Sequence, residues 1–253
     1  MKIAVCGKGG SGKSTITALL AKELSRMGKD VLVIDSDESN YGLSRQMGVE
    51  LPKDFTAYFG GKEKAQKDMM LSNFTHQFFK ETWTFSDVPE GYYAEKDGVK
   101  LMSSGKIHTA NEGCACTMGN IIRQFVEHLN LTENEYALMD MEAGIEHFGR
   151  GTDNGMDLIL MIVDPSYESL ALSGKILELG NAIGKPVRFV LNKVNDENRE
   201  LMKNGVCEKA EVICEILEDD FIRGAGLQGK ELSLEMESVR DLAKRIISKS
   251  ATK

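Results

Sequence analysis

The chain lacks the long apolar runs of membrane proteins and the basic surplus of general nucleic-acid binders. No stretch of its 253 residues approaches the roughly 18 apolar residues that a membrane-spanning helix needs. Lys and Arg number 31 against 39 Asp and Glu, which gives a formal net charge of −8. Proteins that grip nucleic acid by its phosphates usually have the opposite balance. We therefore expect neither a membrane nor a nucleic acid among its partners.

The first ten residues also lack the features of a secretory signal peptide. A single lysine and a short apolar run precede a glycine-rich stretch, where a signal peptide would carry a longer apolar region and a cleavage site. We expect a cytoplasmic protein with reduced cysteines, because disulfides are rare in that compartment. The count of five cysteines agrees, since an odd number leaves at least one thiol unpaired.

Strand and helix patterns alternate along most of the chain. A strand, a helix and a second strand within the first 35 residues form a βαβ unit with a right-handed crossover. The whole pattern predicts one doubly wound α/β domain over residues 1–253, with a mostly parallel sheet and helices on both faces. Residues 44–98 have no clean period and are predicted to be a less regular insertion. Strands are expected at 2–7, 30–35, 99–104, 136–142, 157–164, 187–194 and 210–217, and helices at 13–28, 118–130, 167–182 and 235–249.

The stretch "GKGGSGKS" joins the first strand to the first helix and fits the phosphate-loop pattern G-x-x-x-x-G-K-[ST] at every fixed position. Glycines let backbone N–H groups surround phosphate oxygens, and the helix N-terminus adds a partial positive charge. Lys13 would reach the β and γ phosphates, and the Ser14 hydroxyl would bind Mg²⁺. The motif predicts a P-loop nucleotide site made by Gly9, Gly10, Ser11, Gly12, Lys13, Ser14 and Thr15.

A second lysine, Lys8, begins the same loop. The stretch "KGGSGKS" resembles the deviant Walker A signature of the MinD, nitrogenase iron protein and partitioning ATPases. The resemblance implies that Lys8 reaches across a dimer interface to the partner's nucleotide. It also implies that Asp37, in "VLVIDSDES", orients or activates the attacking water. Lys8, Lys13 and Asp37 are therefore the expected catalytic residues, while Asp35 is expected to be structural.

A third carboxylate ends another apolar strand. Asp140, in "YALMDMEAG", occupies the position of the Walker B carboxylate, which holds Mg²⁺ through water. Gly144 then permits a turn that senses the γ-phosphate. Ser14 and Asp140 are thus the expected magnesium residues.

The stretch "VLNKVND" bears on the choice of base. It places Asn192 and Lys193 at a strand end, close to the N-K-x-D pattern of GTPases, but Asn195 replaces the carboxylate that pairs with guanine. We therefore expect ATP rather than GTP, with Asn192 and Lys193 at the nucleotide. The resembled ATPases often carry a base-contacting proline after the last strand, and the nearest equivalent here is Leu217.

Two cysteines lie one residue apart in "NEGCACTMGN". Taken alone, such a C-x-C pair is more often two plain thiols than part of a metal site, and two thiolates fall short of the four ligands of a closed zinc site. A two-fold dimer would bring Cys114 and Cys116 of both copies together. Four sulfurs suffice for tetrahedral Zn²⁺ or square-planar Ni²⁺.

The combination of "GKGGSGKST", "CAC" and "YALMDMEAGIEHFGRGT" resembles the CooC family, the nickel-insertion ATPases of carbon monoxide dehydrogenase, and the related AcsF maturation factors of acetyl-CoA synthase. The resemblance implies a homodimer that binds Ni²⁺ as cargo through Cys114 and Cys116 of both chains, with Zn²⁺ possible in the isolated protein. It further implies ATP hydrolysis linked to metal delivery to a client Ni–Fe–S enzyme.

Two other functions stay open at this point. A MinD- or ParA-like positioning ATPase is one, because the closing segment "SVRDLAKRIISKS" is basic and amphipathic, as a membrane-surface anchor would be. An iron–sulfur carrier ATPase is the other. The nitrogenase iron protein, however, uses two well-separated cysteines per chain, whereas this chain has an adjacent pair.

Overall fold

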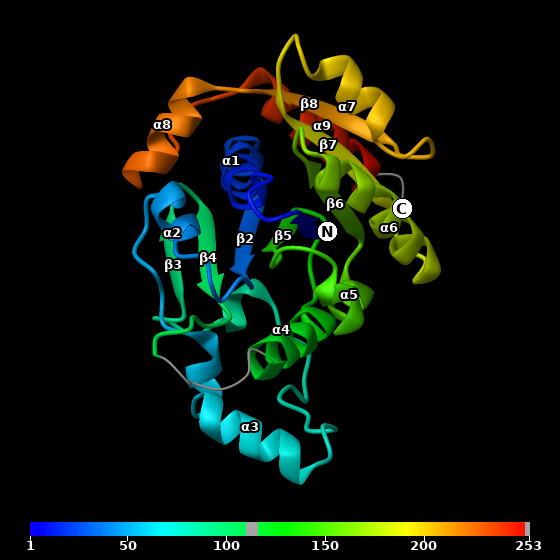
Figure 1. Ribbon diagram of the computed structural model, residues 1–253. Helices are drawn as coiled ribbons and strands as arrows, with labels where there is room; N and C mark the ends of the chain where they lie inside the picture. The colour runs from blue at the N-terminus through cyan, green and yellow to red at the C-terminus, as the bar shows by residue number, and fades with distance from the viewer. Residues whose placement is uncertain (110–115, 251–253) are drawn as a thin grey trace.

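The computed structural model describes residues 1–109 and 116–250 (Figure 1). In these residues eight strands form one sheet, in the order β3-β4-β2-β5-β1-β6-β7-β8. Neighbouring strands run parallel, except that β3 pairs antiparallel with β4 at one edge. The prediction of a mostly parallel sheet is confirmed. The strands are β1 (Lys2–Gly7), β2 (Asp30–Asp35), β3 (Tyr93–Lys96), β4 (Val99–Ser103), β5 (Glu135–Asp140), β6 (Leu158–Val163), β7 (Val187–Val194) and β8 (Val212–Leu217).

Helices cover both faces of this sheet, as predicted. Along β1, Ile3 and Val5 face a core that includes α1 and α9, while Ala4 and Cys6 face a second core that includes α4 and α6. Successive strand residues point to opposite faces, so a strand buried on both sides is apolar throughout. The helices are α1 (Lys13–Arg26), α2 (Gly42–Met47), α3 (Lys62–Leu71), α4 (Cys116–His128), α5 (Glu146–Gly149), α6 (Tyr167–Ala182), α7 (Arg199–Gly205), α8 (Asp220–Gln228) and α9 (Glu237–Ser250), with short 3-10 turns at Phe55–Phe59, Phe85–Asp87 and Thr152–Gly155.

The region 44–98 is more ordered than its sequence pattern suggests. It contains α3 and β3 (Figure 1). Its irregular parts pack through aromatic rings rather than through a periodic face. The Phe55 ring lies 5.4 Å from that of Phe125 on α4, and the Phe79 ring lies 5.2 Å from that of Trp83. Edge-to-face pairs at such distances stabilise a core without regular secondary structure. The missing period is explained by this kind of packing.

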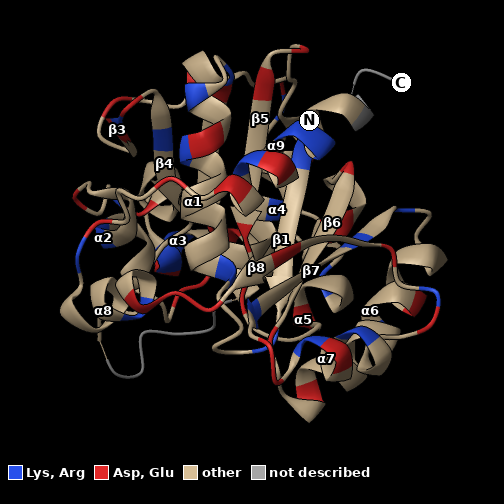
Figure 2. Cartoon of the chain, turned by 90° about the horizontal axis from the view of Figure 1, so that it is seen from above, with Lys and Arg blue, Asp and Glu red and all other residues tan. Residues whose placement is uncertain are grey.

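The closing helix α9 is docked on the rest of the molecule. Val239, Leu242, Ala243 and Ile246 are all buried in the core that α1 shares. Basic and acidic residues are interspersed over the helices and loops (Figure 2). Within residues 1–109 and 116–250, no helix combines the length and apolar content needed to cross a bilayer.

The carboxyl ends of β1, β2, β5 and β7 lie at the same edge of the sheet. Asp35 at the end of β2 is the register partner of Asp140 at the end of β5, and Asp140 is in turn the partner of Val5 on β1. In parallel α/β sheets, ligands bind at this edge. The polar residues that the sequence analysis singled out at strand ends are gathered here.

Candidate nucleotide-binding site

The loop between β1 and α1 requires glycine at two positions for steric reasons. Gly7 has φ 145°, and a Cβ there would lie 2.4 Å from the carbonyl oxygen of Ile162. Gly12 has φ 98°, and its Cβ would lie 2.3 Å from Nδ2 of Asn192. Only glycine adopts such a backbone with so little space. The two fixed glycines of the motif therefore set the shape of the loop.

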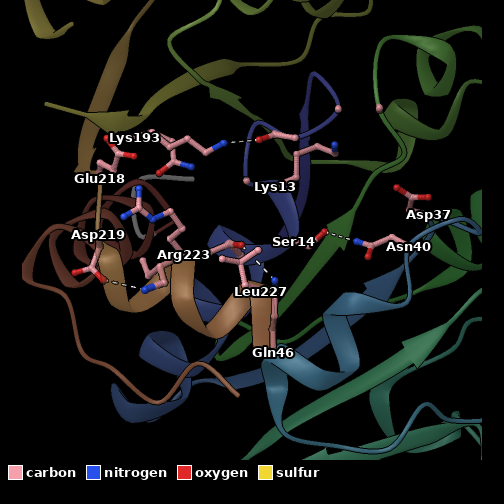
Figure 3. A pocket seen from close by; sticks show the side chains of 18 of the residues that line it. Lys13, Ser14, Asp37, Asn40, Gln46, Lys193, Glu218, Asp219, Arg223 and Leu227 are labelled. Atoms are coloured by element: carbon pink, nitrogen blue, oxygen red, sulfur yellow. Dashed lines mark hydrogen bonds between the residues drawn. The ribbon is translucent and has the colours of Figure 1, made fainter. Parts of the chain in front are cut away.

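The end of β7 supports this loop from outside. The Asn192 amide Nδ2 donates to the Ser11 carbonyl at 2.8 Å. The Lys193 ammonium, labelled in Figure 3, donates to the Gly10 carbonyl at 2.7 Å. Lys193 itself has φ 59°, a left-handed conformation that residues with side chains adopt rarely. The sequence predicts both residues at the nucleotide, and both line the adjoining pocket while bracing the loop.

A pocket of about 900 Å³ opens in front of the loop. Pockets of this size hold small ligands such as nucleotides. Its walls include every residue of the loop from Gly9 to Thr15 except Ser11, whose side chain is buried. Lys13 reaches the pocket from the start of α1, where its ammonium lies 3.3 Å from the Lys8 carbonyl oxygen. The Lys8 side chain is half-buried and does not belong to the lining.

One wall of the pocket is formed by β8 and α8. The sequence predicts the strand and points to Leu217, which lines the pocket, but it does not predict α8. Figure 3 shows α8 and the Asp37 loop on either side of the loop that carries Lys13. Gly224 and Gly226 weaken the helical pattern of α8, because glycine has low helix propensity. Asp219 was the available signal, since its side chain caps the helix by accepting from the Ile222 amide at 2.9 Å. The wall consists of Leu217, Glu218, Asp219, Ile222, Arg223, Gly226 and Leu227.

Ser14 and Asp140 lie together below the pocket. The Ser14 hydroxyl donates to Asp140 Oδ2 at 2.6 Å and accepts from the Asn40 amide at 2.7 Å. Asp140 is 1% exposed, and its Oδ1 has no hydrogen-bond partner within the described residues. Mg²⁺ prefers oxygen ligands and often binds through one carboxylate plus phosphates. The buried, unsatisfied carboxylate and the hydroxyl beside it fit such a cation.

The burial of Asp140 and the charges around it also change the pKa of its carboxyl group. Burial raises its pKa to about 7, with the Asp35 carboxylate adding to the effect, while the Ser14 hydrogen bond and the Lys13 charge oppose it. A cation at Oδ1 would favour the charged form.

This raised pKa predicts a pH-dependent stability in protein without Mg²⁺ or nucleotide. Between about pH 4 and pH 7, folded Asp140 keeps a proton that the unfolded chain has lost, so its contribution to the free energy of unfolding falls as pH rises. Asp140→Asn should therefore gain stability relative to wild type between pH 5 and pH 8, by about 2 kcal/mol. Urea unfolding at the two pH values measures the difference. Asp196→Asn, at a side chain that is 99% exposed, is the control. An equal effect of Asp140→Asn at both pH values would contradict the assignment.

The two aspartates of "VLVIDSDES" have different surroundings. Asp35 is 1% exposed and accepts from the buried Lys106 ammonium at 2.6 Å. Burial raises its pKa to about 6, although Lys106 pulls it down. Asp37 lines the pocket, and its Oδ1 accepts from the amide and hydroxyl of Ser39 at 3.0 and 2.6 Å. The placement agrees with a structural Asp35 and a nucleotide-facing Asp37, whose catalytic role stays a prediction.

The turn after β5 approaches the loop from the other side. The Gly144 amide donates to the Gly7 carbonyl at 3.1 Å, and Gly144 has φ 91°. Beyond it, His147 is 2% exposed and lies with Nδ1 2.7 Å from Asp153 Oδ2. A γ-phosphate sensor at Gly144 would thus be held by buried contacts on its C-terminal side.

None of the four cysteines that the structure describes lines this pocket. Cys116 begins α4 with an exposed side chain, and Cys114 lies outside the described residues. Cys6 is buried in the core, while Cys207 and Cys214 are half-buried. In the part of the chain that the structure describes, no three His, Cys, Asp or Glu side chains are grouped to hold a metal. A metal site at the C-x-C pair stays a prediction.

Comparisons with known proteins identify the family of the chain. A family model described as "CobQ/CobB/MinD/ParA nucleotide binding domain" matches residues 2–232. The chain is 46% identical over 244 residues to an uncharacterized ATP-binding protein of Methanocaldococcus jannaschii, which spans 96% of this chain and 98% of that protein. It is 36% identical over 197 residues to the carbon monoxide dehydrogenase accessory protein CooC of Rhodospirillum rubrum, which spans 77% of this chain and 74% of that protein.

The fold is similar to that of a solved structure with bound nucleotide. The septum site-determining protein MinD of Pyrococcus horikoshii, complexed with Mg-ADP, has a TM-score of 0.69 over 97% of this chain and 95% of that chain. The sequences are 18% identical, so this likeness concerns the fold. The family match includes both the phosphate loop and the β8–α8 wall of the pocket.

Proposed function

Because the chain belongs to the CobQ/CobB/MinD/ParA nucleotide-binding family, we propose that it is a dimeric ATPase that delivers Ni²⁺ to a Ni–Fe–S enzyme. Carbon monoxide dehydrogenase or acetyl-CoA synthase is the proposed client. One observation carries the proposal: a complete phosphate loop with the early Lys8 stands in the same chain as a C-x-C pair. The similarity to a carbon monoxide dehydrogenase accessory protein supports the nickel half.

The proposed reaction is the hydrolysis of ATP to ADP and phosphate. The backbone N–H groups of the loop and the Lys13 ammonium would hold the phosphates, because preorganised donors stabilise the charge that develops in transfer. Asp37 would orient the attacking water at the pocket wall. Lys8 would reach the nucleotide of the partner copy. When bound by Ser14 and Asp140, Mg²⁺ would neutralise charge on the β and γ phosphate oxygens.

The cargo site is proposed at Cys114 and Cys116 of two copies. One chain supplies two sulfurs, so four require a dimer, and Ni²⁺ accepts a square-planar set of such ligands. A site divided between copies can bind or release its metal when the copies shift. Nucleotide-dependent dimer contacts would then couple hydrolysis to delivery.

Titration of the reduced, anaerobic protein with Ni²⁺ tests this function. We expect a thiolate-to-nickel absorption band that saturates at one metal per dimer. The titration is done with and without ADP or ATP, and light scattering gives the mass of the protein in each sample. The double variant Cys114→Ala/Cys116→Ala should lose the band and keep ATP hydrolysis. Metal binding by the double variant as tight as in wild type would contradict the cargo site.

Cys207→Ala/Cys214→Ala is a matched control, because both thiols are half-buried. Burial raises the pKa of the Cys214 thiol to about 11, and a protonated thiol is a poor metal ligand. This control should keep the nickel band at wild-type intensity.

A positioning ATPase is the second candidate, since MinD and ParA share the family. Its membrane version would need the apolar face of α9, and that face is buried against the core. Co-sedimentation with liposomes that depends on ATP, combined with no nickel band, would favour this candidate.

A further inference from the structure

Lys106 is a buried lysine that the proposed mechanism does not use. It follows β4, and its side chain is 0% exposed. Its ammonium donates three short hydrogen bonds, to Asp35 Oδ2 at 2.6 Å, to the Asp37 carbonyl at 2.6 Å and to the Asn40 carbonyl at 2.5 Å. An ammonium has three N–H donors, so all of them are satisfied.

Two of these acceptors belong to the loop that faces the nucleotide pocket. Asp37 lines the pocket, and the Asn40 amide donates to the Ser14 hydroxyl (Figure 3). Lys106 therefore fixes the backbone of both residues whose side chains approach the phosphate and magnesium positions. A change in its contacts would move Asp37 relative to Ser14.

The segment around Lys106 is joined to the same loop by further bonds. The Ser104 amide donates to the Asp35 carbonyl at 2.9 Å, and the Ile107 amide donates to the Glu38 carbonyl at 3.2 Å. The Tyr41 hydroxyl donates to the Ile107 carbonyl at 2.6 Å. Residues 104–107 and 35–41 are thus bonded along their length, with the ammonium in the middle.

A simpler role for Lys106 would be to neutralise the buried Asp35 carboxylate, but that role explains only one of the three hydrogen bonds of its ammonium. A buried ion pair is seldom more stable than an apolar pair of similar volume, so stability alone favours it weakly. The bonds to the carbonyls of residues 37 and 40 fix loop geometry, which an apolar side chain cannot do.

We propose that Lys106 is a positioning residue for ATP hydrolysis, which holds the Asp37 loop in its working geometry and links that loop to residues 104–107. The inference rests on the hydrolysis half of the proposed function and is independent of nickel binding. Nucleotide binding at Asp37 should therefore also stabilise the backbone of residues 104–107.

The test compares two buried lysines. Lys106→Met removes the positioning ammonium. Lys22→Met removes the ammonium that donates to Glu231 at 2.7 Å and to the Leu232 carbonyl at 2.9 Å, away from the pocket lining. Small misplacements of reacting groups can lower rates by about 10²-fold, so we expect Lys106→Met to reduce kcat by about 10- to 100-fold. Affinity for a fluorescent ADP analogue should stay near wild type, and Lys22→Met should change neither quantity.

A double variant separates positioning from charge balance. Asp35→Asn/Lys106→Met removes the buried carboxylate that Lys106→Met alone leaves without its cation, yet still lacks the donor for the two loop carbonyls, so its kcat should stay low. A kcat restored to the wild-type value would overturn the proposal, and so would a single variant that behaves like Lys22→Met. The double variant also gives the answer if Lys106→Met fails to fold.

Hydrogen exchange tests the link directly. Adding ADP should slow exchange in peptides covering 35–41 and 104–107 together in wild type. In the Asp35→Asn/Lys106→Met variant, which keeps only the Ser104, Ile107 and Tyr41 bonds between the segments, the slowing in 104–107 should be weaker. A slowing in 104–107 of the variant as large as in wild type would refute the role of Lys106 in the link. If wild type hydrolyses no ATP, the proposed function fails, and this exchange measurement still decides whether Lys106 joins the two segments.

Discussion

Lys13→Ala is expected to lower kcat for ATP hydrolysis by about 10²–10³-fold, the usual loss when one preorganised donor to a transition-state oxygen is removed. It should also weaken ADP binding, because the ammonium contacts phosphates in the ground state too. Lys13 is 7% exposed at the mouth of a pocket whose loop supplies the other donors. Phosphate release and fluorescent-nucleotide binding measure the two effects.

The substitution should leave the fold intact, since the Lys13 ammonium contacts the Lys8 carbonyl at a long 3.3 Å. Lys22→Met again serves as the control on the same helix, because it removes a buried ammonium outside the pocket lining. Unchanged hydrolysis in Lys13→Ala would mean that the pocket is not the site of ATP turnover.

The phosphate loop and the strands could be predicted because their causes are local. A parallel strand buried on both faces must be apolar along its buried length, as β6 and residues 3–7 of β1 are. The loop must have glycine where a Cβ would meet Ile162 or Asn192, so a short sequence motif is enough to predict its shape. For such elements, neighbouring residues alone carry the information.

Lys106 and α8 depend on contacts between distant segments. A loop lysine is expected to be exposed, and the burial of Lys106 depends on carbonyl groups of residues 37 and 40, more than sixty residues earlier in the chain. Helix α8 contains Gly224 and Gly226, so its helical state is not suggested by propensity. Its role as a pocket wall appears only when the sheet brings β8 beside β7.

The placement of Asp37 illustrates a partial success. Side-chain alternation would place Asp35 and Asp37, two residues apart, on the same face of a regular strand. However, β2 ends at Asp35, and the structure buries the first aspartate and exposes the second to the pocket. What alternation does not reveal is the partner of the buried carboxylate, Lys106. The strand pattern therefore predicts neither the direction of Asp37, which lies beyond the end of β2, nor the contacts of Asp35.

Lys8→Ala is expected to bind nucleotide and fail to hydrolyse it, with kcat reduced by roughly 10³-fold or more, as for other catalytic cations supplied in trans. The Lys8 carbonyl, which accepts from the Ser11 amide at 3.1 Å, is retained in the variant, so the loop should keep its shape. The Lys8 side chain does not line the pocket of its own chain. Lys8→Ala should therefore impair hydrolysis without impairing nucleotide binding, whereas Lys13→Ala should impair both.

Mixing two inactive variants distinguishes a lysine acting across the dimer from one acting within its own chain. Asp37→Asn should lower kcat by about 10²–10⁴-fold, the usual contribution of a group that assists proton transfer. In a mixed dimer the Lys8→Ala copy keeps Asp37 and receives Lys8 from the Asp37→Asn copy, so one of its two sites is complete. Random assortment makes half of the dimers mixed, so the mixture should recover about a quarter of the wild-type rate. If Lys8 served its own nucleotide, neither copy would have a complete site, and the mixture would be no more active than the two variants measured apart.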